Sequence, residues 1–208
     1  MGVKETLEAI VKEKAPGPSH SFQMFHVIKM LELLSTSPVG RGILSKRLDI
    51  GEGATRTLID RLKVKRIISV SKSGCTLTEK GEKLWKRIEK GIPSRTDLEK
   101  SELTLSACNV AILIKAKAHR VKLGMEQRDA AFLVGAKGAT TLVMKKGKLT
   151  MPGEDVDIKE TAPESRSKIV SSLKPKEGDV VIIGSADTHD LAEYGAIAAA
   201  WTLLDDDV

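Results

Sequence analysis

The residues best suited to recognise another molecule form a polar face within residues 54–64. Apolar side chains recur there at helical spacing, and two arginines, a threonine and an aspartate fall on the opposite side. An arginine reads guanine through two hydrogen bonds or clamps a phosphate, whereas a threonine contacts a thymine methyl group or a phosphate. The segment therefore predicts a helix that reads base edges in the major groove of double-stranded DNA. Its predicted contacts are Ala54, Arg56, Thr57, Asp60 and Arg61.

Three further basic side chains flank this face. Lys46 and Arg47 end the preceding helical run, where they are predicted to contact phosphates of the duplex. Lys72 lies at the tip of a predicted hairpin, where a side chain can contact the DNA backbone or the minor groove. These positions extend the predicted DNA contacts to both sides of the reading helix.

The distribution of charge agrees with a polyanionic partner. Residues 41–90 hold 14 basic and 6 acidic side chains, whereas residues 152–208 hold 5 basic and 13 acidic ones. Aromatic residues make up only 3% of the chain, so stacking platforms for single-stranded nucleic acid are scarce. The front half of the chain is therefore expected to bind double-stranded DNA, and the acidic end is not.

A set of helices and strands must hold these residues in place. Residues 22–34 and 40–48 have helical periodicity, a glycine-containing turn follows, and residues 54–64 continue as a helix. The hydrophobic period then changes to that of two short strands joined at the turn 71–74, and Thr78 begins a last helix. This order of elements is that of a winged helix-turn-helix.

Residues 62–82 carry motifs typical of winged-helix regulators, in which a helix ends, a strand begins and an LT-x-x-G helix closes the wing. The chain resembles these regulators over residues 22–91, although Arg66 stands where they usually have glycine before the first wing strand. As a whole it is similar to archaeal winged helix-turn-helix transcriptional regulator-like proteins with a C-terminal domain of unknown function. The resemblance implies a transcriptional regulator that binds double-stranded DNA. The motifs are Leu62-Lys-Val-Lys-Arg66-Ile67-Ile68, Ser73-Gly74 and Leu77-Thr78-Glu79-Lys80-Gly81-Glu82.

The second half of the chain predicts the order β-α-β-β-α-β, followed by one more helix. That order is typical of a ferredoxin-like sandwich, so the expected fold class is α+β, with this sandwich behind the winged helix. Winged helices joined to such domains resemble feast/famine regulators, whose second domain dimerises and binds a small effector. Helix 187–204 is apolar nearly all round, so we expect it to be buried against the sheet or in a homodimer interface. The other predicted elements are strands 105–115, 139–145, 148–152 and 179–184, and helices 124–135 and 162–173.

The predicted domain boundaries follow from these patterns. Residues 1–19 are expected to form an N-terminal helical arm, and residues 20–91 the winged-helix DNA-binding domain. Residues 92–104 are polar and are expected to be a linker or a short connecting helix. Residues 105–208 are expected to bind an effector or to hold a homodimer together.

Two glycine-containing loops, residues 135–141 and 184–189, predict a site for a small anionic effector. In a ferredoxin-like topology both loops fall at the same end of the sheet, where backbone N–H groups and hydroxyls can hold an anion. The alternative is that the glycines simply form turns. The candidate effector-binding residues are Lys137, Gly138, Thr140, Gly184, Ser185 and Thr188.

Four polar side chains, Asp187, His189, Asp190 and Glu193, crowd into one and a half turns of the last predicted helix. They could hold a divalent metal, but acidic residues in the first turn of a helix are also what the helix dipole favours. We therefore interpret them as structural and expect no metal and no cofactor. The two cysteines lie far apart, without the spacing of a zinc site.

No nucleophile and base pair, Walker loop or metal quartet is visible, so no enzymatic activity is expected. Two alternatives stay open: an enzyme or ligand-binding domain fused to an autoregulatory winged helix, and a winged helix that serves as a protein-interaction module. No apolar stretch approaches the roughly 18 residues needed to span a bilayer. We therefore expect a cytoplasmic protein without a membrane partner.

Overall fold

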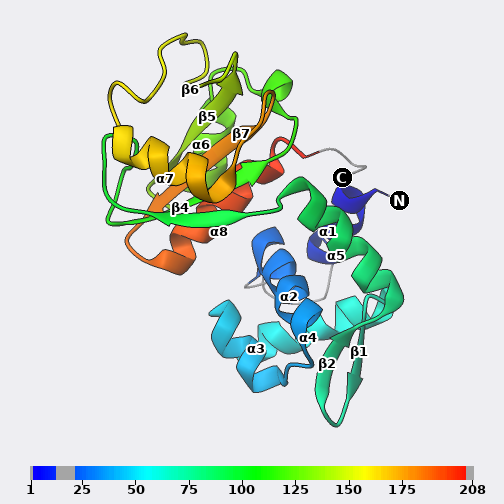
Figure 1. Cartoon of the computed structure of the whole chain (residues 1–208). Helices are drawn as coiled ribbons and strands as arrows, with labels where there is room; N and C mark the ends of the chain where they lie inside the picture. The colour runs from blue at the N-terminus through cyan, green and yellow to red at the C-terminus, as the bar shows by residue number, and fades with distance from the viewer. Residues whose placement is uncertain (1, 13–21, 205–208) are drawn as a thin grey trace. The chain divides into compact units, whose positions relative to one another are not determined.

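The structure, a computed structural model, describes residues 2–12 and 22–204 of the chain (Figure 1). The chain divides into two compact units between Ile88 and Glu89. The first unit is helical with a small two-stranded sheet, and the second is built on a five-stranded sheet. Among the described residues, no helix combines the length and the apolar character that crossing a membrane requires.

The first unit has the predicted order of three helices, a hairpin and a closing helix. Strands β1 and β2 pair antiparallel, with Ser71 opposite Gly74 at the turn, and the leucine-rich faces of the helices form the core. The predicted succession of elements in this unit is therefore confirmed. Its elements are α1 (Val3–Lys12), α2 (Met24–Thr36), α3 (Arg41–Leu48), α4 (Glu52–Val64), β1 (Ile68–Ser71), β2 (Gly74–Leu77) and α5 (Glu79–Gly91).

Helix α1 belongs to the core of the first unit and does not form a separate arm. Val3, Leu7 and Ile10 share one face of the helix at three- and four-residue spacing and are buried, and α1 packs against α2 and α4. The rest of the segment predicted as an arm, residues 13–19, lies outside the described residues.

A buried histidine lies in the first turn of α2. His26 is 7% exposed, and its Nδ1 accepts a hydrogen bond of 2.8 Å from the backbone N–H of Gln23, the residue that caps the helix. Burial lowers the pKa of His26 from 6.5 to about 4, because the charged imidazolium loses its hydration there. The folded chain therefore keeps this histidine neutral at pH values where an unfolded chain protonates it.

This pKa predicts a loss of stability as the pH falls from 6.5 towards 4. In that window the unfolded state binds a proton that the folded state does not, so the free energy of unfolding falls by up to about 1.4 kcal/mol per pH unit. Urea unfolding followed by the fluorescence of Trp85, in a Trp201→Phe background, measures it. His26→Gln is expected to flatten this pH dependence, and His119→Gln, at an exposed position, is expected to leave it unchanged.

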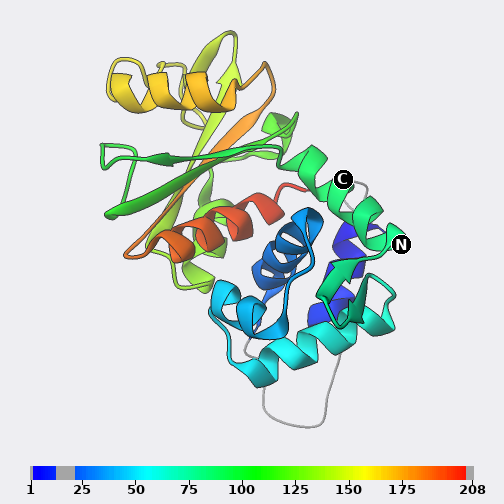
Figure 2. The same cartoon turned by 60° about the horizontal axis from the view of Figure 1, so that its bottom comes forward.

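The second unit is built on one sheet with the strand order β3-β4-β7-β5-β6, in which every neighbouring pair is antiparallel. Helices cover both faces of the sheet: α6 and α8 pack together on one face, and α7 lies on the other (Figure 2). Its elements are β3 (Arg95–Leu98), β4 (Cys108–Ile114), the 3-10 helix η1 (Ala118–Arg120), α6 (Met125–Leu133), β5 (Gly138–Lys145), β6 (Lys148–Thr150), α7 (Pro163–Leu173), β7 (Val180–Ala186) and α8 (His189–Trp201).

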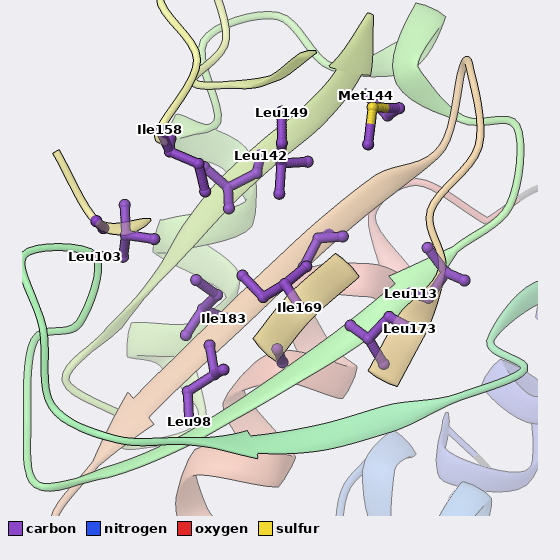
Figure 3. Packing of buried hydrophobic residues seen from close by; sticks show 13 residues of the cluster. Leu98, Leu103, Leu113, Leu142, Met144, Leu149, Ile158, Ile169, Leu173 and Ile183 are labelled. Carbon is purple, nitrogen blue, oxygen red and sulfur yellow. The ribbon is translucent and has the colours of Figure 1, made fainter. Parts of the chain in front are cut away.

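The central strands β4 and β7 are buried on both faces. Alternate side chains such as Leu113 and Ile183 meet Ile169 and Leu173 of α7, as Figure 3 shows, while the intervening residues of both strands meet α8. The predicted ferredoxin-like sandwich is not confirmed, because such α+β sandwiches keep their helices on one face of the sheet. The predicted mixture of helices and strands in this half of the chain is confirmed, whereas the ferredoxin-like arrangement is not.

Residues 92–104 are not simply a linker, because they contain strand β3. Arg95 lies opposite Ile112 and Leu98 opposite Asn109 in the antiparallel pair with β4. Only Leu98 of the four residues in β3 is buried, as befits a short charged strand at the edge of a sheet. A strand with so little alternation of apolar and polar residues leaves no clear signal in the sequence.

Candidate nucleic-acid interface

Helix α4 carries the predicted reading face on its outer side. Arg56 and Asp60 are exposed, whereas Ala54 and Thr57 are half-buried, and the Thr57 hydroxyl donates to the carbonyl of Gly53 at 3.0 Å. The inner side of the helix is anchored by buried residues at three- and four-residue spacing, so the outer side has a fixed orientation. These buried anchors are Thr55, Leu58, Ile59 and Leu62.

The predicted place of Arg61 on this outer face is wrong. Arg61 is 6% exposed, and its Nη1 donates to the carbonyls of Ile10 at 2.7 Å and Val11 at 3.1 Å. Its guanidinium also lies 5.2 Å from the ring centre of Phe22. The two carbonyls belong to the last turn of α1, where a helix lacks its own donors and favours a positive charge. Arg61 therefore holds α1 in place and is not available to read bases.

Lys63 takes the place of Arg61 on the outer face, which sequence reasoning missed. Arg56, Asp60 and Lys63 follow each other at four and three residues along α4, and all three are exposed. We call these three residues the reading stripe. Helical spacing alone predicts that Lys63 lies on this face. Arg61 was predicted there instead because an arginine can bind guanine through two hydrogen bonds.

The predicted flanking contacts are on the surface of the same unit. Lys46 and Arg47 are exposed in the last turn of α3, and Asp49 takes the left-handed conformation, with a φ of 52°, that ends this helix. Arg41 forms an ion pair of 3.8 Å with Glu52 at the start of α4. Because Lys46 and Arg47 are exposed, both could contact the phosphates of a duplex that binds at α4.

The hairpin holds Lys72 at its exposed tip, between Ser71 and Gly74. Gly74 has a φ of +124°, and a Cβ there would come within 2.7 Å of the backbone of Val39. The backbone of Val39 also pairs with that of Cys75. Only glycine allows this close approach, so the wing is fastened to the segment before α3.

The left-handed turn before β1 explains why winged-helix regulators usually have glycine at the position that Arg66 occupies here. Arg66 has a φ of 57°, a conformation that glycine adopts more easily than any residue with a Cβ. The Thr78 hydroxyl lies 2.7 Å from the carbonyl of Arg66 and 3.0 Å from that of Ile67, so it can donate to either. It also accepts from the N–H of Gly81 and so caps α5.

The two glycine loops of the second unit lie side by side, but their polar groups already have partners. The backbone N–H of Lys137 donates to the carbonyl of Ser185 at 2.8 Å. Ser185 is fully buried, and its hydroxyl donates to Asn109 Oδ1 at 2.7 Å and accepts from the N–H of Leu105. The Thr140 hydroxyl donates to a backbone carbonyl at 2.8 Å.

The start of α8 is likewise satisfied from within the chain. The Thr188 side chain accepts a hydrogen bond from the N–H of Leu191, and Lys137 Nζ lies 3.1 Å from Asp187 Oδ2. The hydrogen bond from Lys137, followed by that from Ser106, lowers the pKa of the Asp187 carboxyl. An anion here would compete with Asp187 for Lys137, so the predicted effector site is not supported.

The two candidate glycines of these loops serve packing. Gly138 has a φ of +138° and lies under the side chains of Leu105 and Phe132. Gly184 lies on β7 beneath α8, where a Cβ would come 2.2 Å from the carbonyl oxygen of Ala192. Both positions need the smallest residue because another segment lies directly against the backbone.

Gly184→Ala is therefore expected to lower the free energy of unfolding of the second unit by about 2–3 kcal/mol, because α8 must move off the sheet. Thermal unfolding followed by Trp201 fluorescence, in a Trp85→Phe background, measures the change as a fall in Tm of several degrees. Gly42→Ala in α3, where no atom lies within 4 Å of an added Cβ, is the matched control and is expected to be neutral or stabilising. An unchanged Tm for Gly184→Ala would contradict this account of the packing.

The acidic cluster at the start of α8 connects this helix to the edge strand. Ligand atoms of His189, Asp190 and Glu193 lie within 4.8 Å of one another. However, the buried Glu193 carboxylate forms an ion pair with Arg95 of β3, and His189 Nε2 lies 2.8 Å from Asp97 Oδ1 on the same strand. Burial lowers the pKa of Arg95. These contacts agree with the structural interpretation, because they use the same side chains that a metal would need.

A cavity of about 720 Å³ opens between the loop after β3 and the first turn of α7. Ser165 is buried on the α7 side, where its hydroxyl donates to Ser101 Oγ at 2.9 Å. The lining carries four carboxylates and two lysines, so it is polar and more acidic than basic. The charged lining residues are Asp97, Glu99, Glu102, Glu164, Lys100 and Lys168.

Comparison with known proteins finds a matching family for each half of the chain. Residues 22–92 match the family described as the CggR N-terminal DNA binding domain, and residues 105–203 match a domain of unknown function, DUF4443. A solved structure of a hypothetical protein from Pyrococcus horikoshii OT3 is similar, with a TM-score of 0.70 and 31% identity over 88% of this chain and 93% of that chain. No curated protein matches the chain. The prediction of an N-terminal DNA-binding domain is confirmed.

Proposed function

We propose, from the premise that this chain belongs to the same family as the Pyrococcus horikoshii protein, that it is a DNA-binding transcriptional regulator. The observation that carries the proposal is the exposed reading stripe on α4, within the segment that matches the CggR N-terminal DNA binding domain. Residues 41–90, around this stripe, hold 14 basic and 6 acidic side chains. A basic surface beside an exposed helix face suits the major groove of a duplex.

In this proposal the contacts divide into those that read bases and those that bind phosphates. Arg56 reads guanine, and Asp60 accepts a hydrogen bond from the amino group of cytosine. Lys46, Arg47 and Lys72 contact phosphates and set the orientation of α4 without reading sequence. The exposed Lys63 adds a cation at the far end of the reading stripe.

The second unit has a regulatory and not a catalytic part in this proposal. Two polar side chains at the start of α8, Glu193 and His189, contact Arg95 and Asp97 of β3. A small anionic effector at the two glycine loops is not part of the proposal, because those loops use their polar groups for internal contacts.

Titration of the full chain against fluorescent duplexes of genomic sequence, at 50 to about 300 mM salt, tests the proposal, because phosphate contacts make affinity fall steeply with salt. Lys72→Ala is expected to weaken binding to all duplexes about equally and to reduce the salt slope by about one contact. Lys83→Ala removes the same charge from α5, where Lys83 lies 2.6 Å from Glu79, and is expected to change neither. Absence of duplex binding at physiological salt would favour the protein-interaction alternative.

A further inference from the structure

Two buried hydroxyl groups of the second unit have no hydrogen-bond partner among the described residues. They are Oγ1 of Thr141 on β5 and Oγ1 of Thr150 on β6, and the two residues are only 5% and 3% exposed. A hydroxyl that leaves water without gaining a partner costs free energy, so each such group calls for an explanation. Thr141 lies against Gly124, where an added Cβ would come 3.3 Å from its Oγ1, whereas Thr150 lines a cavity.

The cavity beside Thr150 has a volume of about 250 Å³ and a basic lining. Lys145, Lys146 and Lys148, all exposed, contribute to it from the hairpin that joins β5 and β6 (Figure 1). Within the described part of the chain no carboxylate pairs with these three ammonium groups, and Lys148 Nζ donates to the backbone carbonyl of Asp155 at 3.4 Å. Asp155 also lines the cavity, so three positive charges stand against one negative charge.

The register of the hairpin explains why these groups converge. Lys145 is paired with Lys148, and Val143 with Thr150. Since side chains two residues apart on a strand share a face, Lys145, Lys148 and Thr150 lie on the same face of the hairpin. Like charges directly opposite each other on paired strands are destabilising. The hairpin by itself therefore combines two unfavourable features, an opposed pair of lysines and an unpartnered hydroxyl, and a single anion relieves both.

We propose that this cavity binds a terminal phosphate group, either of a small phosphate monoester or of inorganic phosphate. The hydroxyl of Thr150 donates to one phosphate oxygen, and Lys145, Lys146 and Lys148 neutralise the charge. A phosphate monoester carries about 1.5–2 negative charges at neutral pH and has three strongly accepting oxygens. Lysine binds such a group as a point charge, without the fixed orientation that an arginine requires. The proposed ligand thus matches both the charge of the lining and its one buried donor.

The size and depth of the site favour a small anion over the backbone of a duplex. Its volume of about 250 Å³ is below the range of about 300–1,000 Å³ that is typical of pockets for drug-sized ligands. Because Thr150 is only 3% exposed, its hydroxyl is reached only by an atom that enters the cavity. A terminal phosphate presents three free oxygens, whereas a phosphodiester in a duplex is flanked by two sugars. The site therefore belongs to a ligand other than the DNA, and it is separate from the two glycine loops.

Isothermal titration calorimetry of the full chain with inorganic phosphate, in a buffer without other polyvalent anions, tests the proposal. Phosphate is expected to bind once per chain with a micromolar to millimolar dissociation constant and to raise Tm in proportion to its excess over that constant. Glycerol 3-phosphate distinguishes the two sources, because a monoester site binds it at least as tightly as the free ion, whereas a site for the free ion does not. Dimethyl phosphate, a diester with one negative charge, is expected to bind at least about tenfold more weakly than phosphate.

Thr150→Val distinguishes ligand binding from a structural role of the hydroxyl. Valine has the same shape and is favoured in strands, so Tm without phosphate is expected to stay the same or to rise, while phosphate binding weakens about tenfold. Thr141→Val is the matched control: it removes the other unpartnered hydroxyl and is expected to leave phosphate affinity unchanged. Lys145→Ala and Lys148→Ala are each expected to weaken phosphate binding about tenfold. Lys168→Ala, at an exposed position of α7, is expected to have no effect.

Several outcomes would overturn the proposal. They are the absence of binding at millimolar phosphate, an affinity that Thr150→Val leaves unchanged, and equal losses of affinity in Thr150→Val and Thr141→Val. A lower Tm of Thr150→Val without phosphate would show that the hydroxyl has a partner within the chain, and it would contradict the proposal as well. The titrations contain no DNA, so their result is independent of the duplex titrations that test the proposed function.

Discussion

Arg56→Ala is expected to lower the affinity for the preferred duplex about tenfold to a hundredfold, and to relax the sequence preference at one base pair. Arg56 is exposed on the outer side of α4, whose inner side is fixed by buried residues such as Leu58 and Leu62. Its guanidinium can therefore reach a base edge without any movement of the helix. Selection from a random duplex pool identifies the preferred sequence, and titration at fixed salt then compares the variants.

Two further variants distinguish recognition of a base from nonspecific electrostatic attraction to the phosphates. Arg56→Lys keeps the positive charge but loses the paired donors that match guanine, so it is expected to retain nonspecific affinity and to lose preference. Lys63→Ala is expected to weaken all duplexes alike, as removal of a phosphate contact does. Preferred-duplex binding by Arg56→Ala at the affinity of the unaltered chain would show that α4 does not read bases through this residue.

Arg61→Ala is expected to lower the free energy of unfolding of the first unit by about 3 kcal/mol, with little effect on the salt dependence of DNA binding. The substitution leaves the carbonyls of Ile10 and Val11 without the donor that now lies 2.7 and 3.1 Å away. An unsatisfied buried polar group costs about 1–3 kcal/mol, and the contact with Phe22 is lost as well. Because Arg61 joins α4 to the last turn of α1, the release of α1 should precede global unfolding.

Urea unfolding and hydrogen exchange measure these two effects of Arg61→Ala. Faster exchange is expected first at the amides of α1, since that helix depends on the arginine for its last-turn partners. Arg56→Ala is the matched control, because it removes an exposed arginine from the same helix and is expected to change stability by less than about 0.5 kcal/mol. Unchanged stability together with a large loss of specific DNA affinity would return Arg61 to the reading face.

Much of the first unit was predictable because its elements depend on short-range spacing. Helical periodicity identified α2, α3 and α4, and the change to alternating residues identified the hairpin with Lys72 at its tip. The cap that Thr78 forms for α5 is equally local, because it accepts from the N–H of Gly81 only three residues further along the chain. Such features are visible in sequence because the atoms that interact are close along the chain.

The second unit was less predictable because strand order depends on pairing between distant segments. The apolar runs that became β4 and β7 are recognisable, but nothing local makes β7 lie between β4 and β5. Gly184 allows α8 to lie against β7, and this packing brings helices to both faces of the sheet. The edge strand β3 carries almost no pattern, because only Leu98 of its four residues is buried.

The polar face of α4 separates what the sequence determines from what only the tertiary structure decides. Spacing alone determined that Arg56 and Asp60 share a side of the helix, and the structure leaves both exposed. Only the tertiary structure decided that Arg61 is buried, because its partners in α1 lie some fifty residues away and reach it only through folding. The sequence thus determines which side chains share a face, whereas packing between distant segments decides which faces water can reach, since burial requires two surfaces to meet.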